Sequence, residues 1–384
     1  MMRRVAALSA LAAILTACSR LGASHGLPAA SLSFEPPTPA GRTKFATIFV
    51  FGGSDGLGPS GALIARDGKL YGTTSGGGKH GHGIVFSITP AGSEAVLHSF
   101  GGDGRAPTGS LLAVDGALYG ATKYGGAHKS GTIFAMGADG SKLWTYDFKG
   151  GNDGAAPAGG LTNLRGALYG VTGSTFFRIT KSGGETALRA FTHDRDGGLP
   201  NGNLVAVHGA FFGTANDGGR AKTSPGVVMR LTTSGGENVL HEFANSGDGR
   251  NPSAGLVLLN GVFYGTTANG GKYSGGTIFS ITLGGRERVI HDFGSGPDGR
   301  SPACRLIVAN GKLYGTTSYG GLYNRGTIFE ASSDGKERAL YTFVGSSDGG
   351  VPASGLVLMD GVLYGTTTSG PSSHPYGTVF ALTL

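Results

Sequence analysis

Short apolar runs alternate with glycine-bearing turns along nearly the whole chain. Between residues 255 and 293 the runs "GLVLL", "VFYGTT", "GTIFSIT" and "ERVIHDF" follow one another. Each run has the length of a strand, is rich in β-branched and aromatic residues, and is bounded by turn residues. The pattern therefore predicts a unit of four short antiparallel strands without helices.

This unit occurs seven times. The glycine of the "YGTT" phrase marks the copies, which are 43 to 52 residues apart: Gly72, Gly120, Gly170, Gly213, Gly265, Gly315 and Gly365. A second phrase, Asp-Gly-x-x-Pro, recurs in the same register, beginning at Asp55, Asp103, Asp153, Asp196, Asp248, Asp298 and Asp348. Periods of this length are typical of solenoids, propellers and arrays.

Two-residue turns link the first and second runs of every copy. They are Asp67-Gly68, Asp115-Gly116, Arg165-Gly166, His208-Gly209, Asn260-Gly261, Asn310-Gly311 and Asp360-Gly361. Such pairs favour tight hairpins, and glycine, at 75 of 384 residues, supplies the positive φ that hairpins require. Seven units of four antiparallel strands predict an all-β fold, a seven-bladed β-propeller.

The two ends of the repeat array complement each other. The seventh copy stops at Leu384 after its third run, whereas the run "KFATIFVF", residues 44–51, precedes the first Asp-Gly-x-x-Pro without partners. We therefore expect the N-terminal strand to complete the last blade, because ring closure removes an exposed sheet edge.

The tandem phrase "LYGTT..GG....GTIF", with Asp-Gly-x-x-Pro between copies, resembles the bacterial GloVer-type tandem repeat, called choice-of-anchor because its members reach the cell surface through different signals. The resemblance covers residues 44–384 and implies no particular biochemical activity. The third and fourth copies depart from the phrase: "YGVTGSTFFRIT" nearly lacks the Gly-Gly loop, and Phe212 replaces the tyrosine.

The N-terminus reads as an export signal. Arg3 and Arg4 precede an apolar run that is too short for a comfortable membrane span. Cys18 follows Leu-x-Ala, which resembles the bacterial lipobox and implies cleavage before Cys18 and acylation of it. We expect a signal peptide over residues 1–17, lipidated Cys18 with a Pro/Ser/Ala-rich tether over 18–43, and the propeller over 44–384. Ser19 after the cysteine favours the outer membrane, with the propeller in the periplasm or at the surface.

Charge and cysteine content narrow the range of possible binding partners. The formal charge of +7 comes from basic residues that are scattered rather than clustered, so nucleic-acid binding gains little support. With Cys18 lipidated, Cys304 has no intramolecular partner, and packing rather than a disulfide must stabilise the chain. The expected partners are the membrane, through the lipid, and an unidentified glycan, small molecule or protein. A monomer is expected.

Function is expected on the face with the longer loops, near the mouth of the central channel. The loops from second to third strands carry aromatic, amide and cationic groups that suit a polar, anionic or sugar-like ligand, although such groups also simply solvate exposed loops. We call them the rim residues: Lys79, His80, His82, Lys123, Tyr124, His128, Asn216, Asp217, Arg220, Asn269, Lys272, Tyr273, Tyr319, Tyr323, Asn324, Arg325, His374 and Tyr376.

The seven aspartates of Asp-Gly-x-x-Pro invite comparison with a carboxylate ring or metal site. A turn explains them more simply, because Asp can accept hydrogen bonds from backbone N–H groups two residues on, Gly permits positive φ and Pro sets the next strand. One site would not need seven identical copies. We therefore expect a structural role for these residues and no metal.

Enzyme signatures fail on their context. The sequences "GGSDG" (52–56) and "GSSDG" (345–349) match Gly-x-Ser-x-Gly without a strand-to-helix elbow, and "GGGKHG" (76–81) matches Gly-x-Gly-x-x-Gly without a following helix. His80 and His82 lack a third metal ligand assigned by spacing. No cofactor is expected, and no catalytic residue is assigned. A binding or interaction module is favoured, with two alternatives: a propeller-type lyase, glycosidase or quinone-dependent dehydrogenase, or a structural envelope protein.

Overall fold

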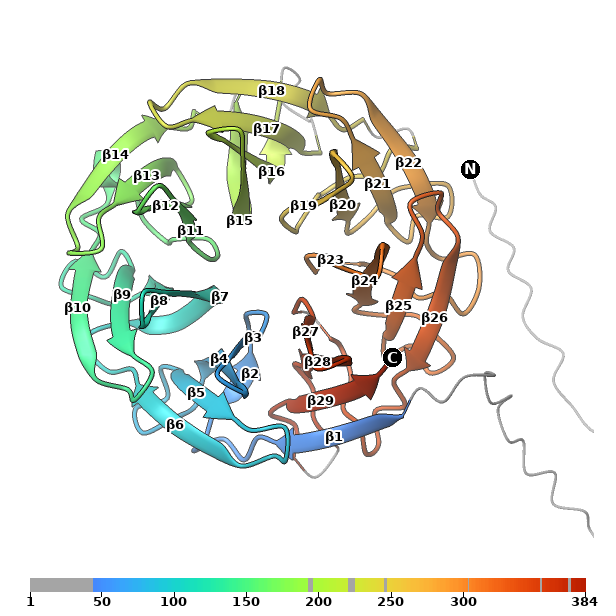
Figure 1. Ribbon diagram of the computed structural model, residues 1–384, viewed down its shortest axis with the longest axis horizontal. Coiled ribbons are helices and arrows are strands. Elements are labelled where there is room, and N and C mark those ends of the chain that lie inside the picture. The colour runs from blue at the N-terminus through green and yellow to red at the C-terminus, as the bar shows by residue number, and fades with distance from the viewer. Residues whose placement is uncertain are drawn as a thin grey trace, which may run out of the picture. The chain divides into compact units, whose positions relative to one another are not determined.

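The computed structural model describes residues 44–384 except 193–195, 220–224, 245–246, 303, 353 and 372–373. The predicted signal peptide and tether therefore lie outside the described residues. Seven antiparallel sheets stand around a central axis as the blades of a β-propeller, six with four strands and one with five because its innermost strand is divided in two, confirming the predicted fold (Figure 1). Apart from the 3-10 turn η1 (Gly151–Asp153), the described residues form only strands, turns and loops. No helix among them is long and apolar enough to cross a membrane.

Each blade runs from the axis outward. The innermost strands are β2 (Leu57–Pro59) with β3 (Ile64–Arg66), β7 (Arg105–Val114), β11 (Thr162–Leu164), β15 (Gly197–Val207), β19 (Val257–Leu259), β23 (Ile307–Ala309) and β27 (Val357–Met359). The second strands are β4 (Lys69–Gly76), β8 (Ala117–Tyr124), β12 (Ala167–Val171), β16 (Ala210–Gly218), β20 (Val262–Thr267), β24 (Lys312–Thr317) and β28 (Val362–Thr367).

The outer half of each blade holds the third strands and the peripheral strands. The third strands are β5 (Ile84–Ile88), β9 (Thr132–Gly137), β13 (Thr175–Ile179), β17 (Val227–Thr232), β21 (Thr277–Ile281), β25 (Thr327–Ala331) and β29 (Thr378–Thr383). The peripheral strands are β6 (Glu94–Ser99), β10 (Lys142–Asp147), β14 (Glu185–Ala190), β18 (Glu237–Glu242), β22 (Glu287–Asp292), β26 (Glu337–Thr342) and β1 (Phe45–Val50).

The N-terminal strand closes the ring as predicted. β1 pairs antiparallel with β29, with Phe45 opposite Leu382 and Val50 opposite Thr378. In Figure 1 the blue strand β1 lies beside the red strand β29 at the perimeter. The seventh blade thus takes its peripheral strand from the start of the propeller and its other three from the end.

The two-residue turns adopt the geometry of tight hairpins. The first residue of each turn has φ between 48° and 52°, and the glycine that follows has φ between 71° and 86°. Positive φ at both positions is the condition for a type I′ turn, whose twist matches that of the flanking strands. Arg165 and His208 adopt the same conformation, although a positive φ is uncommon for residues other than Gly, Asn and Asp.

A glycine–phenylalanine contact holds the middle of the blades together. A Cβ atom built on the glycine of "YGTT" would lie 2.3 to 2.7 Å from the ring of the third-strand phenylalanine in six blades, for example Gly120 against Phe134. In the fourth blade Met229 takes the place of the phenylalanine, and Leu204 lies nearest Gly213 instead. The repeated glycine therefore makes room for a large buried side chain, which explains its place in every copy.

Candidate ligand site in the central channel

The innermost strands surround a cavity of about 590 Å³ at the axis of the ring. Half-buried apolar side chains of several blades line it, among them Ile64, Leu112, Val114, Val205 and Ile307. The lining extends along these strands toward the hairpins that follow them, as at Val114, one residue before its turn. This larger chamber therefore opens toward the face of the tight hairpins.

A narrower chamber of about 170 Å³ lies on the other side, toward the long loops. Small residues line it, including Ser60, Ser253 and Ser354. Glycines bring the backbones of adjacent blades close together here: a Cβ on Gly61 would lie 2.0 Å from the oxygen of Gly109. The channel is thus tight and polar on this side.

One residue of each blade lies where the chambers meet, directly before the leucine that begins the first apolar run. We call these seven equivalent positions the girdle: Ala62, Ser110, Gly160, Asn203, Gly255, Arg305 and Gly355. Five of them line both chambers, namely Ala62, Ser110, Asn203, Arg305 and Gly355. Four of the seven are alanine or glycine, so the three polar side chains break the sevenfold repetition of the ring.

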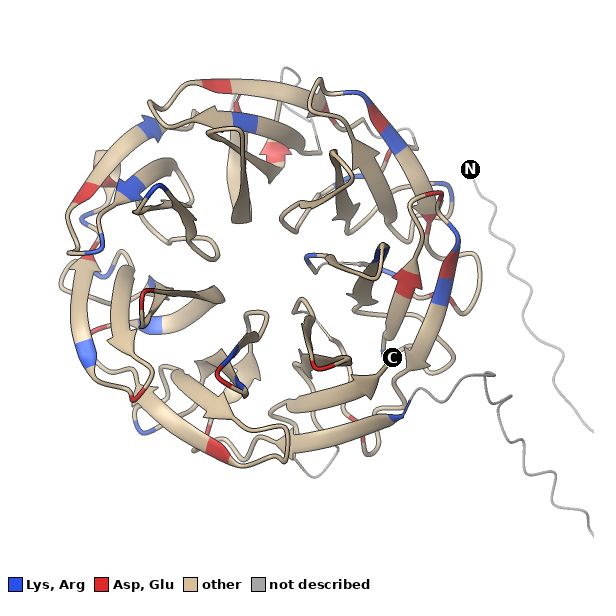
Figure 2. Ribbon diagram, in the orientation of Figure 1, with Lys and Arg blue, Asp and Glu red and all other residues tan. Residues whose placement is uncertain are grey.

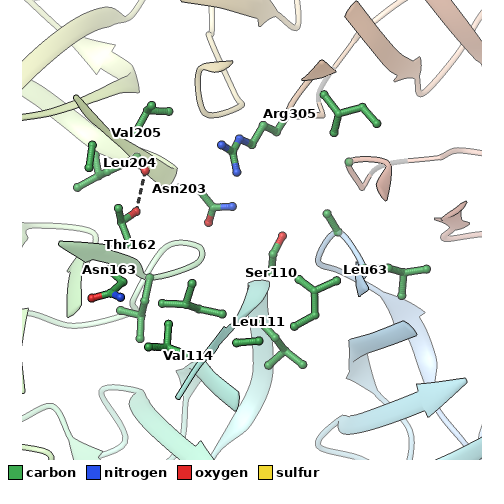
Figure 3. A pocket seen from close by; sticks show the side chains of 18 of the residues that line it. Leu63, Ser110, Leu111, Val114, Thr162, Asn163, Asn203, Leu204, Val205 and Arg305 are labelled. Atoms are coloured by element: carbon green, nitrogen blue, oxygen red, sulfur yellow. Dashed lines mark hydrogen bonds between the residues drawn. The ribbon is translucent and has the colours of Figure 1, made fainter. Parts of the chain in front are cut away.

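Arg305 brings a positive charge into the channel. Its Nε atom donates a hydrogen bond to the backbone oxygen of Leu256 on the preceding blade, at 3.3 Å. Burial lowers the pKa of the guanidinium, and no carboxylate among the described residues offsets that effect. Figure 3 shows the guanidinium directed toward the channel axis. A partly buried cation without a counter-ion among the described residues is costly, which makes Arg305 a candidate for binding an anionic group.

Asn203 and Ser110 add neutral polar groups from two other blades, and their side chains face the same space as the guanidinium of Arg305 (Figure 3). The Oδ1 atom of Asn203 is buried against Gly160 and has no hydrogen-bond partner among the described residues. Both residues lie where the register of their strand shifts, between Thr108 and Leu112 in β7 and between Asn201 and Val205 in β15. Bulges of this kind re-aim side chains, and here they direct an amide and a hydroxyl toward Arg305.

The arrangement is suited to binding an anionic or strongly polar group. An Arg guanidinium, an amide and a hydroxyl can each donate hydrogen bonds, and the apolar surroundings strengthen such bonds. The described residues that line the two chambers include no Asp, Glu, His, Lys or Tyr. Figure 2 agrees, with charged residues mainly on the peripheral strands and at the hairpin tips.

The rim residues lie elsewhere, and none of them lines either chamber. Arg220 lies outside the described residues. Most of the others are exposed, and His82, Asn216, Asp217 and Asn269 are half-buried. Their role in binding stays a prediction.

Contacts of the rim residues are local. Lys123 and Lys272 lie over the rings of the neighbouring Tyr124 and Tyr273, at 5.5 and 5.1 Å from the ring centroids. Asn216 and Asn269 belong to a chain of amides that links the fourth and fifth blades. Asn216 donates to Asn201 at 2.9 Å, Asn251 donates to the backbone oxygen of Asn216 at 3.3 Å, and Asn269 donates to Asn251 at 3.3 Å. These contacts order individual loops without gathering the rim into one cluster.

The aspartates of Asp-Gly-x-x-Pro serve their turns, with one difference from expectation. Each of the seven carboxylates accepts a backbone N–H bond of 2.6 to 3.3 Å. The donors lie two to four residues before the aspartate, as Gly52 lies before Asp55, whereas the sequence predicts donors after it. The carboxylate thus closes the loop that leaves the peripheral strand, before the next blade begins.

Several of these aspartates also face a glutamate at the start of the next peripheral strand. Burial, together with the nearby aspartate carboxylate, raises the pKa of Glu94, Glu185 and Glu287 to about 7 and that of Glu337 to about 8. A polar side chain often lies between the two carboxyls. The Oη atom of Tyr146, for example, is 2.6 Å from Asp153 and 3.2 Å from Glu185.

The described residues contain no group of three or more His, Cys, Asp or Glu side chains placed to hold a metal ion. Cys304 lines the narrow chamber but is buried, and its Sγ atom accepts a hydrogen bond from the backbone of Thr316 at 3.1 Å. Burial raises the pKa of this thiol, which makes it a poor nucleophile.

One feature of the sequence distinguishes the girdle from the rest of the repeat. When the seven copies are aligned on the leucine of the first run, the preceding residue is Ala or Gly in four copies, Ser in one, and Asn203 and Arg305 in the remaining two. A large charged residue at a position that is otherwise small is a departure from the repeat. The site predicted on the long loops includes none of the girdle positions.

Fold and site together define a seven-bladed β-propeller with a ligand-sized central channel. In sequence, residues 33–174 and 172–380 match the Gloeobacter/Verrucomicrobia repeat, and the chain belongs to this repeat family. No curated protein matches the chain in sequence.

Solved propellers share the fold at low identity. The extracellular domain assigned to a one-component system of B. thetaiotaomicron has a TM-score of 0.60 and 12% identity, covering 88% of this chain and 40% of that one. PorZ, a surface component of the type-IX secretion system of Porphyromonas gingivalis, has a TM-score of 0.54 and 14% identity, with 84% and 46% covered. This chain thus spans less than half the length of either protein.

A protein assigned as a 6-phosphogluconolactonase, from Bacteroides uniformis, has a TM-score of 0.50 and 13% identity, covering 73% of this chain and 83% of that one. Propellers of this kind host many unrelated activities, so these likenesses show the fold alone.

Proposed function

We propose that this protein is an exported, lipid-anchored binding module that holds a small ligand in the central channel of its propeller. The observation that carries the proposal is the girdle. Arg305 lacks a counter-ion among the described residues and is directed into a cavity of about 590 Å³. A purely structural ring would gain nothing from this charge, because an alanine or glycine fills the equivalent position in four blades.

Binding is favoured over the alternative of catalysis by the chemistry of the lining. Propeller enzymes need a titratable group or a metal at the reacting atom. The groups described around the two chambers are a guanidinium, amides, hydroxyls and one buried thiol. They can recognise a polar group but include no evident general base.

Blocking the girdle should remove binding and leave the fold intact. Ser110→Phe places a ring across the channel from a half-buried position that faces the cavity rather than the core. In a thermal-shift and calorimetric screen of sugars, amino acids, organic acids and nucleotides, we expect a compound that binds the wild type to lose affinity by about tenfold or more. The melting temperature should stay close to that of the wild type.

Ser333→Phe, at an exposed hairpin position of the sixth blade, is the matched control and should bind normally. Compounds that bind Ser110→Phe as well as they bind the wild type would place the ligand outside the channel and overturn the proposal.

The anchor is a separate part of the proposal and rests on the N-terminal sequence. Cys18→Ser removes the thiol that the lipobox resemblance assigns to acylation. We expect metabolic labelling with a fatty-acid analogue to be lost and the protein to leave the membrane fraction, which we propose is the outer membrane. Labelling that persists in the variant would refute lipidation at Cys18.

A further inference from the structure

The channel has two chambers of opposite character. The larger chamber is lined mainly by apolar residues, with Thr162 and the exposed Asn163 as polar exceptions, and the narrower one mainly by serine and glycine. The polar groups of Arg305, Asn203 and Ser110 lie at their junction. The Thr162 hydroxyl already donates to the backbone oxygen of Leu204, so apolar groups dominate the free surface of the larger chamber. We therefore expect a ligand that fills this chamber and reaches the girdle to be mainly apolar along its body and polar at one end.

The charge at the girdle indicates the nature of that polar end. The Nε–H group of Arg305 donates its hydrogen bond to Leu256 O. The two terminal amino groups of the guanidinium therefore have no partner among the described residues. Guanidinium binds planar oxyanions with two parallel hydrogen bonds. One cation balances one negative charge, so a carboxylate fits, whereas a doubly charged phosphate monoester would leave a charge uncompensated in apolar surroundings.

The length of the larger chamber bounds the apolar body. Ser110 and Val114 lie four residues apart on β7, which corresponds to at most about 13 Å along the strand, because Ser110 lies within the register shift. Both residues line the larger chamber, Ser110 at the girdle and Val114 next to the hairpin. A hydrocarbon chain or ring system of moderate length can lie along this wall.

We propose that the channel binds an amphipathic monocarboxylate, with its carboxylate at Arg305, Asn203 and Ser110 and its apolar body in the larger chamber. This inference rests on the proposed function and specifies the ligand class of the same site. The site is open to solvent at the hairpin face, and the ligand enters there.

Four probes separate charge from hydrophobicity: octanoate, octan-1-ol, octylammonium and acetate. We would titrate each into the full chain, held in nanodiscs of zwitterionic lipid, and measure heat on binding. Empty nanodiscs give the background from partition into lipid. The expected order of affinity is octanoate first, with octan-1-ol and acetate at least about tenfold weaker because each lacks one half of the recognition. Octylammonium should not bind above background.

Three variants test the assignment to Arg305. Arg305→Gln should weaken octanoate binding by about 10- to 100-fold, as expected for loss of a charge-assisted hydrogen bond, and should leave octan-1-ol unaffected. Arg305→Lys keeps the charge without the planar fork and should recover part of the affinity. Arg286→Gln makes the same change of charge at an exposed hairpin position and should bind as the wild type does.

The outcomes separate this inference from the proposed function. Equal binding of octanoate and octan-1-ol, or of octanoate and acetate, would overturn the amphipathic carboxylate, and so would octanoate affinity unchanged by Arg305→Gln. If no probe binds while Ser110→Phe still abolishes binding of another compound from the screen, the ligand class is wrong and the channel site stands. Binding that is unchanged by Ser110→Phe would overturn both the channel site and the proposed ligand class. Melting curves of Arg305→Gln and Arg305→Lys identify any loss due to misfolding.

Discussion

Deletion of residues 19–51 should destabilise the propeller by several kcal/mol, because it removes the peripheral strand of the seventh blade. Phe51 is fully buried and packs edge-on against Phe86 of the first blade, at 5.3 Å between ring centroids. Phe45 stacks on Tyr341 of the sixth blade at 3.8 Å. The strand thus covers apolar surface on both neighbouring blades, and removing one buried phenylalanine alone costs about 3–5 kcal/mol.

Deletion of residues 19–42 is the matched control and should leave the melting temperature nearly unchanged, since that segment has the composition of a tether. Phe51→Ala gives a milder test in which the strand is kept. Similar melting temperatures for the two truncations would mean that the pairing of β1 with β29 contributes little to stability.

Ring closure could be predicted from the sequence because it follows from counting. A last copy with three runs and an isolated first run leave one arrangement that gives every strand a partner, and the structure pairs Phe45 with Leu382 accordingly. The hairpins could be predicted for a similar reason, since Asn-Gly and Asp-Gly carry their conformation in the dipeptide. Local chemistry and repetition therefore account for the fold.

The channel site could not be predicted in the same way. Ser110, Asn203 and Arg305 are about a hundred residues apart in sequence, and only the radius and tilt of the closed ring bring them around one axis. Those quantities depend on how closely blades pack, as where Gly160 leaves room for Asn203. The repeat alignment shows which positions are unusual, but the structure is needed to show that they face one another.

The donors to the turn aspartates illustrate a smaller limit. The residue types of Asp-Gly-x-x-Pro indicate a turn, but an aspartate can accept bonds from either side along the chain. The direction depends on how the peripheral strand ends. In the structure the loop after that strand folds back onto the aspartate. For example, the backbone N–H of Lys149 donates a hydrogen bond of 2.6 Å to the carboxylate of Asp153.

Stability should also fall as the pH rises above neutrality. Glu94, Glu185, Glu287 and Glu337 have pKa values raised to about 7 or 8 in the folded state, against 4.5 ordinarily. The folded protein therefore holds protons that the unfolded chain has already released, so the free energy of unfolding decreases with pH between these values. The stabilising contribution is complete below about pH 4.5 and is lost as the pH rises through 7 to 8.

Two histidines act in the opposite direction at lower pH. Burial lowers the pKa of His241 and His291, so at these residues the unfolded chain binds more protons than the folded protein does. The contribution of the two histidines to the free energy of unfolding therefore rises with pH up to about 6.5. The decline due to the glutamates should therefore be clearest between about pH 6.5 and 8.5. Because these glutamates are only partly buried, we expect a loss of about 1 kcal/mol for each after allowance for solvent screening.

Glu337→Gln tests this origin, since an amide resembles the protonated carboxyl and does not titrate. Denaturant melts of the variant at about pH 6.5 and 8.5 should show a smaller loss of unfolding free energy than the wild type, by about 1 kcal/mol. Asp334→Asn makes the same change of charge three residues away. The Ser332 hydroxyl holds the pKa of Asp334 below its usual range, so this control should keep the wild-type slope. A wild type equally stable at both pH values, or a Glu337→Gln variant with an unchanged slope, would show that these partly buried glutamates are not protonated at neutral pH.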